Sequence, residues 1–179
     1  MTVDGYIEGR YVNLRSVEEY DAEYTLSLRQ NPELNKYFPH LNITLEQQKA
    51  WICKQRQQEG DYYFIVEDKD GNKVGVVGIY NVNGDTVESG RVIVVGNAIH
   101  SIESQMLSFE FAFDKLNAKR ITHYVYADNT KALRSAMMFG SVFTEPHLDE
   151  HGIMVRDGVI TLENYLKSKE KLDKIIYRR

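Results

Sequence analysis

Alternating hydrophobic and polar residues predict β-strands in the first half of the chain. The predicted strands are Tyr11–Val17, Tyr62–Glu67, Lys73–Val82 and Thr86–Val95. The dipeptides Asp70-Gly71 and Gly84-Asp85 separate the later strands, and such pairs favour tight hairpin turns. We therefore expect the strands from Tyr62 onward to form an antiparallel meander.

Helical patterns lie between the first strand and this meander. The helix predicted over residues 19–29 begins with acidic residues, which the helix dipole favours. It ends before Pro32, because the residue that precedes a proline avoids the helical conformation. Thr44 and Gln47 have the spacing of a capping box, which predicts a second helix running to about Gln58. Glu33–Asn42, between the two helices, has no periodicity and is predicted to be a loop.

The second half of the chain changes to helical periodicity. Large hydrophobic residues recur at steps of four and three, which is the pattern of a buried helix face. They are Ile102, Met106, Phe109, Phe113 and Leu116, and they predict a helix over about residues 102–116. A strand over Arg120–Tyr126 follows, and Asp128-Asn129 then opens a helix over about Thr130–Phe139.

The C-terminal part predicts two more strands within Val142–Leu166, placed on either side of an Asp157-Gly158 turn, and then a charged helix over Lys167–Ile176. Antiparallel strands followed by a strand–helix–strand–helix order are typical of an α+β fold. We expect a mixed, mostly antiparallel central sheet with helices on both faces.

Composition narrows the possible functions. A length of 179 residues suits one domain with a hydrophobic core, and a net charge of −4 argues against a nucleic-acid partner. The single cysteine, Cys53, excludes an intrachain disulfide framework and is expected to be a packing residue. The N-terminal segment lacks the apolar region of a signal peptide, and no apolar run is long enough to cross a membrane. We therefore expect a cytoplasmic protein without a membrane partner.

The segment from the strand ending at Val95 to the following helix has the form of an anion-binding site. Its connecting loop is Gly96-Asn97-Ala98-Ile99-His100-Ser101. Backbone N–H groups at a helix N-terminus lack partners within the helix, and the helix dipole is positive there. For a helix that begins near Ile102, the free N–H groups are those of about His100 to Glu103. Ser101 is then placed to cap this helix or to bind a phosphate.

The order of elements resembles the GNAT acetyltransferase superfamily over nearly the whole chain. The first half is similar to the RimJ/RimL-type branch in Asn31-Pro32-Glu33 and in Thr44-Leu45-Glu46 followed by Trp51. The second half resembles the superfamily in the segments Phe113–Asn117, Arg120-Ile121 and Asp128–Ala132. The resemblance implies a single N-acetyltransferase-like domain over residues 1–179, with acetyl-CoA as co-substrate and no metal.

The resemblance also implies a set of cofactor-binding residues. They are Val94, Val95, Gly96, Asn97, Ala98, His100, Ser101 and Asn129. The residue that matches Asn129 binds the pantetheine region in such enzymes, and a helix cap is its alternative and compatible role. The loop departs from the family pattern, since Ile99 and Ser101 stand where the family has the glycines that hold the pyrophosphate. His100 is either a positive group near a diphosphate or an ordinary surface histidine.

A second departure concerns the general acid. The family's tyrosine, which protonates the departing thiolate, is replaced here by Ala136, and Ser141 replaces the aromatic residue that usually follows the glycine. A thiol with a pKa of about 8.5 is a tolerable leaving group near neutral pH, and a general acid typically contributes about 10²- to 10⁴-fold in rate. Ser135, Tyr124 or water are the candidates to replace it.

The remaining site residues follow from the same comparison. Glu88 is the candidate general base, with a solvent-facing strand residue as its alternative, and an amide of Val92–Val95 is the candidate oxyanion donor. The acceptor is expected to bind under the Glu33–Asn42 loop. The side chains expected to line this acceptor site are Tyr37, Phe38, His40, Tyr126 and also Tyr124.

The other histidines are expected to be structural. His123 lies in a predicted strand and is interpreted as a satisfied sheet residue rather than a catalyst. His147 and His151 stand near acidic residues, but their segment is interpreted as a solvated turn rather than a metal site.

We therefore predict an acetyl-CoA-dependent N-acetyltransferase that acts directly, in a ternary complex, on a primary amine of a small molecule such as a nucleotide-linked amino sugar. A protein N-terminus is the alternative acceptor. A protein of this fold that has lost catalysis and acts as a binding module is the alternative function, motivated by the loop and by Ala136. The expected oligomeric state is a monomer or a homodimer.

Overall fold

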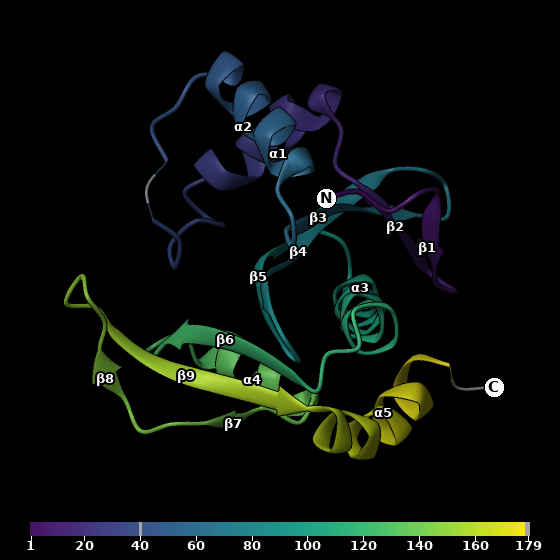
Figure 1. Ribbon diagram of the computed structural model, residues 1–179, viewed down its shortest axis with the longest axis vertical. Helices are drawn as coiled ribbons and strands as arrows, with labels where there is room; N and C mark the ends of the chain where they lie inside the picture. Colours follow the sequence, from purple (N-terminus) through teal and green to yellow (C-terminus); the bar gives the residue numbers. More distant parts are fainter. Residues whose placement is uncertain (40, 178–179) are drawn as a thin grey trace. The chain divides into compact units, whose positions relative to one another are not determined.

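The computed structural model describes residues 1–39 and 41–177, which form two compact units (Figure 1). The first unit contains Met1–Val82 and Gly90–Ser108, and the second contains Asn83–Ser89 and the residues from Phe109 onward. Strand β5 (Thr86–Val94) belongs partly to each unit, because the boundary falls within it.

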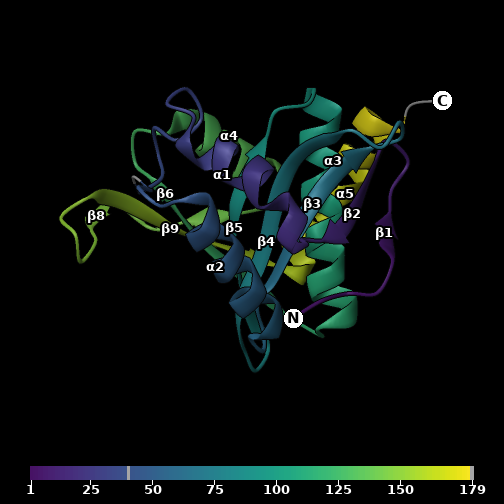
Figure 2. The same cartoon turned by 90° about the horizontal axis from the view of Figure 1, so that it is seen from above.

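The first unit is built on an antiparallel sheet. Its strands are β1 (Tyr6–Glu8), β2 (Val12–Ser16), β3 (Tyr62–Asp68), β4 (Lys73–Asn83) and the later part of β5, and they adjoin in this order. β1, which the sequence pattern does not predict, lies beside β2 at the edge of this sheet (Figure 2). The predicted meander is confirmed.

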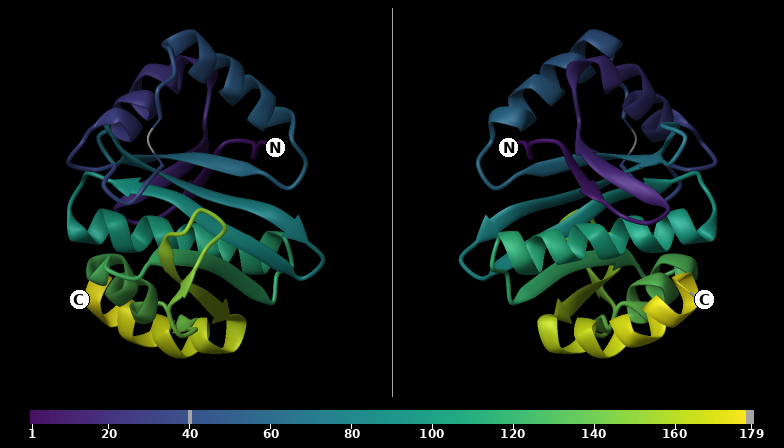
Figure 3. Two further views of the ribbon diagram at one scale, coloured as in Figure 1. Left: turned by 90° about the vertical axis from the view of Figure 1, so that its left-hand side faces the viewer. Right: turned by 90° about the vertical axis from the view of Figure 1, so that its right-hand side faces the viewer.

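Helices cover both faces of this sheet. A short 3₁₀ turn (Glu19–Asp21) leads into α1 (Ala22–Gln30), and α2 (Leu45–Gln57) begins at the predicted Thr44–Gln47 capping box. Figure 3 shows α1 and α2 on one face and α3 (Ala98–Glu110) on the other. Val17, Ile52, Ile65 and Val76 are at most 1% exposed and belong to the core beneath α1 and α2.

The second unit combines parallel and antiparallel pairing. The early part of β5 runs parallel to β6 (Arg120–Tyr126), which pairs antiparallel with β9 (Met154–Thr161). The short strands β7 (Val142–Phe143) and β8 (His147–Leu148) also pair with β9. The helices are α4 (Thr130–Met138) and α5 (Leu162–Ile176). The expected mixed, mostly antiparallel sheet with helices is therefore confirmed.

Aromatic side chains fill the interior of the second unit. The Phe109 ring meets those of Phe139 and Tyr165 edge-on, with centroids 5.2 and 6.1 Å apart. Phe109 and Phe113 belong to the predicted hydrophobic stripe, and both are buried. The helix that contains this stripe ends in a π-helical turn, Phe111–Lys115.

The predicted start of this helix was wrong. α3 begins at Ala98, four residues earlier than the hydrophobic stripe indicates, because the Asn97 side chain caps it. The stripe begins at Ile102 only because the first turn does not face the core: Asn97 and Ala98 are exposed.

The predicted turn at Asp157-Gly158 was also wrong, since both residues lie inside β9. The glycine is required for packing rather than for a turn. A Cβ on Gly158 would lie 2.3 Å from His123 Nε2 and 2.8 Å from Ser141 Oγ. The chain turns instead before β9, and α5 then starts at Leu162, with Thr161 as its cap.

A buried carboxylate ties the first helical segment to the sheet of the first unit. Asp21, whose side chain is 0% exposed, accepts from Arg15 at 2.6 and 2.9 Å and pairs with Lys73 at 2.6 Å. It also accepts the backbone N–H of Glu18 at 2.9 Å. Burial alone would raise the pKa of Asp21, but the hydrogen bonds from Arg15 and Lys73 outweigh it and hold the pKa below its usual value.

A second buried carboxylate holds α3 against the β1–β2 turn. The Glu103 side chain accepts the backbone N–H groups of Arg10, Tyr11 and Val12 at 2.9, 2.6 and 2.8 Å. Glu103 is 0% exposed, so these amides replace the water that a carboxylate otherwise requires.

His123 is a satisfied sheet residue, as predicted. Its Nε2 lies 3.0 Å from Ser141 Oγ, and its ring meets Phe143 edge-on with centroids 5.4 Å apart. Burial lowers the pKa of His123 to about 4, so the ring is neutral near pH 7.

We expect the variant Asp21→Asn to lose about 3–5 kcal/mol of unfolding free energy, because it leaves the Arg15 and Lys73 charges without their buried counter-ion. Urea unfolding followed by circular dichroism measures this loss. Glu163→Gln, which breaks the solvent-exposed pair with Lys167, is the control and should match the wild type. Equal stability of the two variants would contradict the role given to Asp21.

We expect stability to fall as the pH drops from about 6.5 to about 4. Above the unfolded pKa of about 6.5, His123 is neutral in both states and contributes no pH dependence. Below it, only the unfolded chain binds the proton, at a cost on the order of 3 kcal/mol once the pH reaches the folded pKa. His123→Gln should flatten this part of the stability–pH curve, and an unchanged slope in that variant would refute the assignment.

Candidate functional site

The turn between β5 and α3 presents the N-terminus of a long helix. Asn97 Oδ1 accepts the His100 N–H at 3.0 Å, and the Asn97 carbonyl accepts the Ser101 N–H at 3.1 Å. The prediction that the amides of His100 to Glu103 are free was therefore wrong, as was the prediction that Ser101 caps the helix. The amides that precede the first helical hydrogen bond are those of Asn97, Ala98 and Ile99.

Gly96 makes room for the His100 side chain. The His100 ring folds back over Gly96, where an added Cβ would lie 2.5 Å from His100 Nδ1. That nitrogen is buried and has no hydrogen-bond partner among the described residues. Asn97 and Ala98 are exposed, so an anion is able to approach the helix N-terminus from solvent. The amides of Asn97, Ala98 and Ile99 are therefore the groups of this turn that suit an anion such as a diphosphate, whereas the Ser101 amide is already bonded.

The strand before this turn contains a strained residue. Arg91 has a φ of 55°, which is a left-handed conformation that costs energy in any residue other than glycine. Asn81 in β4 has a φ of 51°, but asparagine tolerates this conformation well. A left-handed residue inside a strand turns the neighbouring peptide groups away from the regular ladder.

The Arg91 side chain is held by a buried acid and by aromatic rings. Its guanidinium pairs bidentately with Asp61 at 2.6 and 2.9 Å. It also lies over the rings of Tyr80, Trp51 and Tyr63, at 4.3, 5.2 and 5.6 Å from their centroids. Asp61 is only 4% exposed, so the ion pair is shielded from water. These contacts stabilise the left-handed backbone of β5.

The structure also limits the choice of oxyanion donor. Val95 N–H donates to Val74 O at 2.8 Å, so this amide of the predicted Val92–Val95 group is already used. Val94 is half-buried at the end of β5, and Val95 is 48% exposed.

The predicted catalytic residues of the second unit lie on β5, β6 and α4. Glu88 stands opposite Thr122 in the parallel pairing, and strand alternation places Thr122, Tyr124 and Tyr126 on one face of β6. Tyr124 is 51% exposed, whereas Glu88 and Tyr126 are half-buried. Ser135 is half-buried within α4.

Asn129 caps α4, as predicted. Its Oδ1 accepts the Ala132 N–H at 3.1 Å. This contact uses the side-chain oxygen of Asn129. The side-chain NH₂ group is not needed for the cap.

Two of the predicted acceptor residues, Tyr37 and Phe38, lie in a loop whose backbone hydrogen bonds are accepted by two asparagines. Asn31 O accepts the N–H groups of Leu34 and Asn35, and Asn35 O accepts that of Phe38. Tyr37 and Phe38 are half-buried in this loop, and His40 lies outside the described residues. Residues 31–39 contain neither helix nor strand, as predicted, but their internal hydrogen bonds fix the loop.

Sequence reasoning missed the arginines of this region. Arg91 and Arg29 stand in segments interpreted only as strand and helix, and their aromatic neighbours are distant in sequence. The one available indication was the density of aromatic residues, with Tyr at 12 of 179 positions. In the sequence, Arg91 cannot be distinguished from an ordinary polar residue of an alternating strand.

His147 and His151 each lie beside an acidic residue and not in a cluster. His147 is 3.3 Å from Asp157 and His151 is 3.6 Å from Glu150, and all of these side chains are largely exposed. Across residues 1–39 and 41–177, no group of three or more potential metal-binding side chains is found. The helices in the same ranges are too short or too polar to span a membrane.

Comparisons with known proteins agree with this geometry. Residues 12–142 match the model of the acetyltransferase (GNAT) domain family. The acetyltransferase PseH of Campylobacter jejuni subsp. jejuni serotype O:23/36 (strain 81-176) is 23% identical over 124 residues, which are 68% of this chain and 77% of PseH.

Solved structures show the same fold. The apo structure of FdhC, a nucleotide-linked sugar GNAT, is 25% identical with a TM-score of 0.80, over 99% of this chain and 98% of FdhC. The spermidine N-acetyltransferase of Vibrio cholerae, in complex with CoA and spermine, is 20% identical with a TM-score of 0.79, over 87% of this chain and 98% of that one. The chain belongs to the GNAT family and is an N-acetyltransferase.

Proposed function

We propose that this N-acetyltransferase transfers the acetyl group of acetyl-CoA to the amino group of a nucleotide-linked amino sugar, and that the whole chain forms one catalytic domain. The observation on which this rests is the likeness to FdhC, which extends over 99% of the chain. The sequence likeness to the acetyltransferase PseH supports acetyl transfer but names no acceptor. The matched family region, residues 12–142, includes residues of both compact units.

The first requirement is to bind acetyl-CoA. We assign this to the turn of Gly96, Asn97 and Ala98, of which Asn97 and Ala98 are exposed at the start of α3, and to the Nδ2 group of Asn129 at the start of α4. Val94, His100 and Ser101 complete the proposed cofactor-binding residues. When bound, acetyl-CoA supplies the activated acetyl group, and the residues of this chain orient it.

The second requirement is proton transfer. The attacking amine must be neutral, and Glu88 is the proposed base that receives its proton, directly or through a water molecule. The nitrogen then bonds to the acetyl carbon as the carbon–sulfur bond breaks. The departing thiolate takes a proton from water, Tyr124 or Ser135, and its pKa of about 8.5 makes it a tolerable leaving group without the usual tyrosine.

The third requirement is a fixed strand beside the thioester. Arg91 is the proposed positioning residue for it, because the pair with Asp61 maintains the left-handed turn of β5. An amide displaced from the ladder next to Arg91 is the proposed oxyanion donor. Tyr37, Phe38, His40 and Tyr126 are the proposed acceptor-binding residues, although His40 lies outside the described residues.

A second candidate function is a binding module that has lost catalysis. Two observations favour it: Ala136 replaces the general acid, and the pyrophosphate loop lacks the family glycines. This module would bind acetyl-CoA but would release no thiol.

Thiol release from acetyl-CoA, measured with a chromogenic disulfide, tests the proposed function. We expect turnover with a nucleotide-linked amino sugar and slower or no turnover with spermidine or an N-terminal peptide. Binding of acetyl-CoA in a calorimeter, without thiol release from any of these amines, would establish the module instead. Absence of acetyl-CoA binding at millimolar concentration would refute both functions.

The variant Asn129→Asp distinguishes the role of Asn129 as a helix cap from its proposed contact with acetyl-CoA. Aspartate keeps the oxygen that caps α4 but loses the amide donor, so we expect unchanged stability and a KM for acetyl-CoA about 2- to 10-fold higher. Asn129→Ala removes both contacts and should also lower the melting temperature. An unchanged KM in the aspartate variant would show that Asn129 is a cap alone.

The variant Arg91→Lys tests the positioning role. Lysine keeps the charge but not the bidentate fork, so we expect kcat to fall about 10- to 100-fold while the enzyme stays folded. The KM for acetyl-CoA should change much less than kcat. Arg56→Lys, which alters a helix α2 contact with Glu18, is the control. A folded Arg91→Lys enzyme with wild-type kcat would contradict the proposal.

A further inference from the structure

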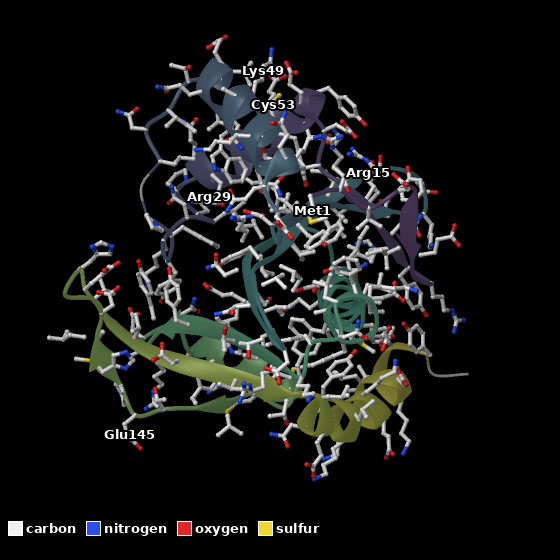
Figure 4. The ribbon with its side chains drawn as sticks, viewed as in Figure 1. Met1, Arg15, Arg29, Lys49, Cys53 and Glu145 are labelled. Atoms are coloured by element: carbon white, nitrogen blue, oxygen red, sulfur yellow. The ribbon has the colours of Figure 1, made fainter. Side chains whose placement is uncertain are left out.

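Arg29 is a cation without a counter-ion in a region where other charges are paired. It lies in the last turn of α1 (Figure 4), and no carboxylate of the described residues pairs with it. Its Nε atom has no solvent-exposed surface and no hydrogen-bond partner among these residues. An arginine stays charged at all ordinary pH values, so a buried N–H without an acceptor is costly.

The two buried aspartates of the first unit, Asp21 and Asp61, are already paired with other cations. Asp21 is already bound by Arg15 and Lys73, and Asp61 is bound by both arms of Arg91 and by Gln55 at 3.0 Å. Tyr63 lies within the electrostatic range of Arg29, and burial raises the pKa of its hydroxyl, so it does not supply a negative charge. The positive charge of Arg29 is therefore uncompensated.

The loop after α1 places an aromatic ring against the guanidinium of Arg29 and bonds to the Arg29 backbone. The Phe38 ring lies 5.0 Å from the Arg29 guanidinium carbon, and the Asn35 side chain donates to the Arg29 carbonyl at 3.2 Å. Gln30 Nε2 donates to the carbonyls of Leu41 and Ile43, which ties the far end of the loop to α1. Arg29 is half-buried, and stacking on one face of a guanidinium leaves its Nη groups able to meet an oxyanion.

A second orphaned group lies on the same helix. The Tyr24 hydroxyl is buried without a hydrogen-bond partner among the described residues, and burial raises its pKa to about 12. It is thus a neutral donor. Tyr24 and Phe38, the ring over which Arg29 lies, pack against the same core cluster.

We propose that Arg29, stacked on Phe38, binds an oxyanion of the acceptor molecule, namely a phosphate or a carboxylate. This inference rests on the proposed function, because Phe38 is one of the proposed acceptor-binding residues. It selects among amines: an acceptor that contains a phosphate or carboxylate gains a charge-assisted contact, whereas a polyamine is repelled by the same group. Arg29 therefore favours a nucleotide-linked sugar over spermidine.

Calorimetry with two probes tests the site independently of catalysis. Uridine diphosphate represents the phosphate source and free glutamate the carboxylate source. We expect one of them to bind the wild-type enzyme about 10- to 100-fold more tightly than Arg29→Gln. Arg10→Gln is the matched control, since Arg10 also lies over an aromatic ring, that of Tyr11 at 5.4 Å, but is exposed. Absence of binding by both probes, or an equal loss in the control, would overturn the proposal.

Steady-state kinetics then separate this site from a structural role. With a nucleotide-linked amino sugar, Arg29→Gln should raise the acceptor KM about 10- to 100-fold, and Arg29→Lys less. The KM for acetyl-CoA and the turnover of the same amino sugar without its nucleotide should not change. An equal effect on charged and uncharged acceptors would assign Arg29 to loop structure alone. If no amine is acetylated, the proposed function is refuted. The calorimetry still tests whether Arg29 binds an oxyanion, because it does not depend on catalysis.

Discussion

The bidentate pair between Arg91 and Asp61 is the interaction on which the geometry of the proposed reaction region depends. Arg91 adopts a backbone conformation that L-residues normally avoid, and it does so inside a strand. A salt bridge to a buried acid and three aromatic rings compensate for this strain. Removing any of these contacts is expected to let β5 relax toward a regular strand, which would move the amides that precede α3.

Buried carboxylates also fix other contacts between helices and strands of the first unit. Asp21 joins the first helical segment to Arg15 and Lys73, and Glu103 joins α3 to the backbone of residues 10–12. A buried carboxylate is tolerated only if its oxygens are fully hydrogen-bonded. The elements that Asp21 and Glu103 connect therefore have few alternative positions. Arg29 differs, because its buried Nε has no hydrogen-bond partner among the described residues, and a ligand is the partner that we propose.

The turn before α3 is shaped by a side-chain cap. The helix begins at Ala98, four residues before the hydrophobic stripe, and Asn97 caps it. The single glycine of the turn, Gly96, makes room for the His100 ring. Because Ala98 has a small side chain and is exposed, the helix N-terminus stays accessible.

The sequence by itself determined the order of the longer strands and of the helices, the capping box at Thr44, the cap at Asn129 and the hydrophobic stripe, because each depends on residues close together along the chain. It failed at the start of α3 and at Asp157-Gly158, where a cap and a tight packing contact outweigh the local pattern. Tertiary structure alone decided which charges meet. Arg91 pairs with Asp61 and Arg29 pairs with no carboxylate of the described chain, since ion pairing depends on distance in space and leaves no periodic trace in the sequence.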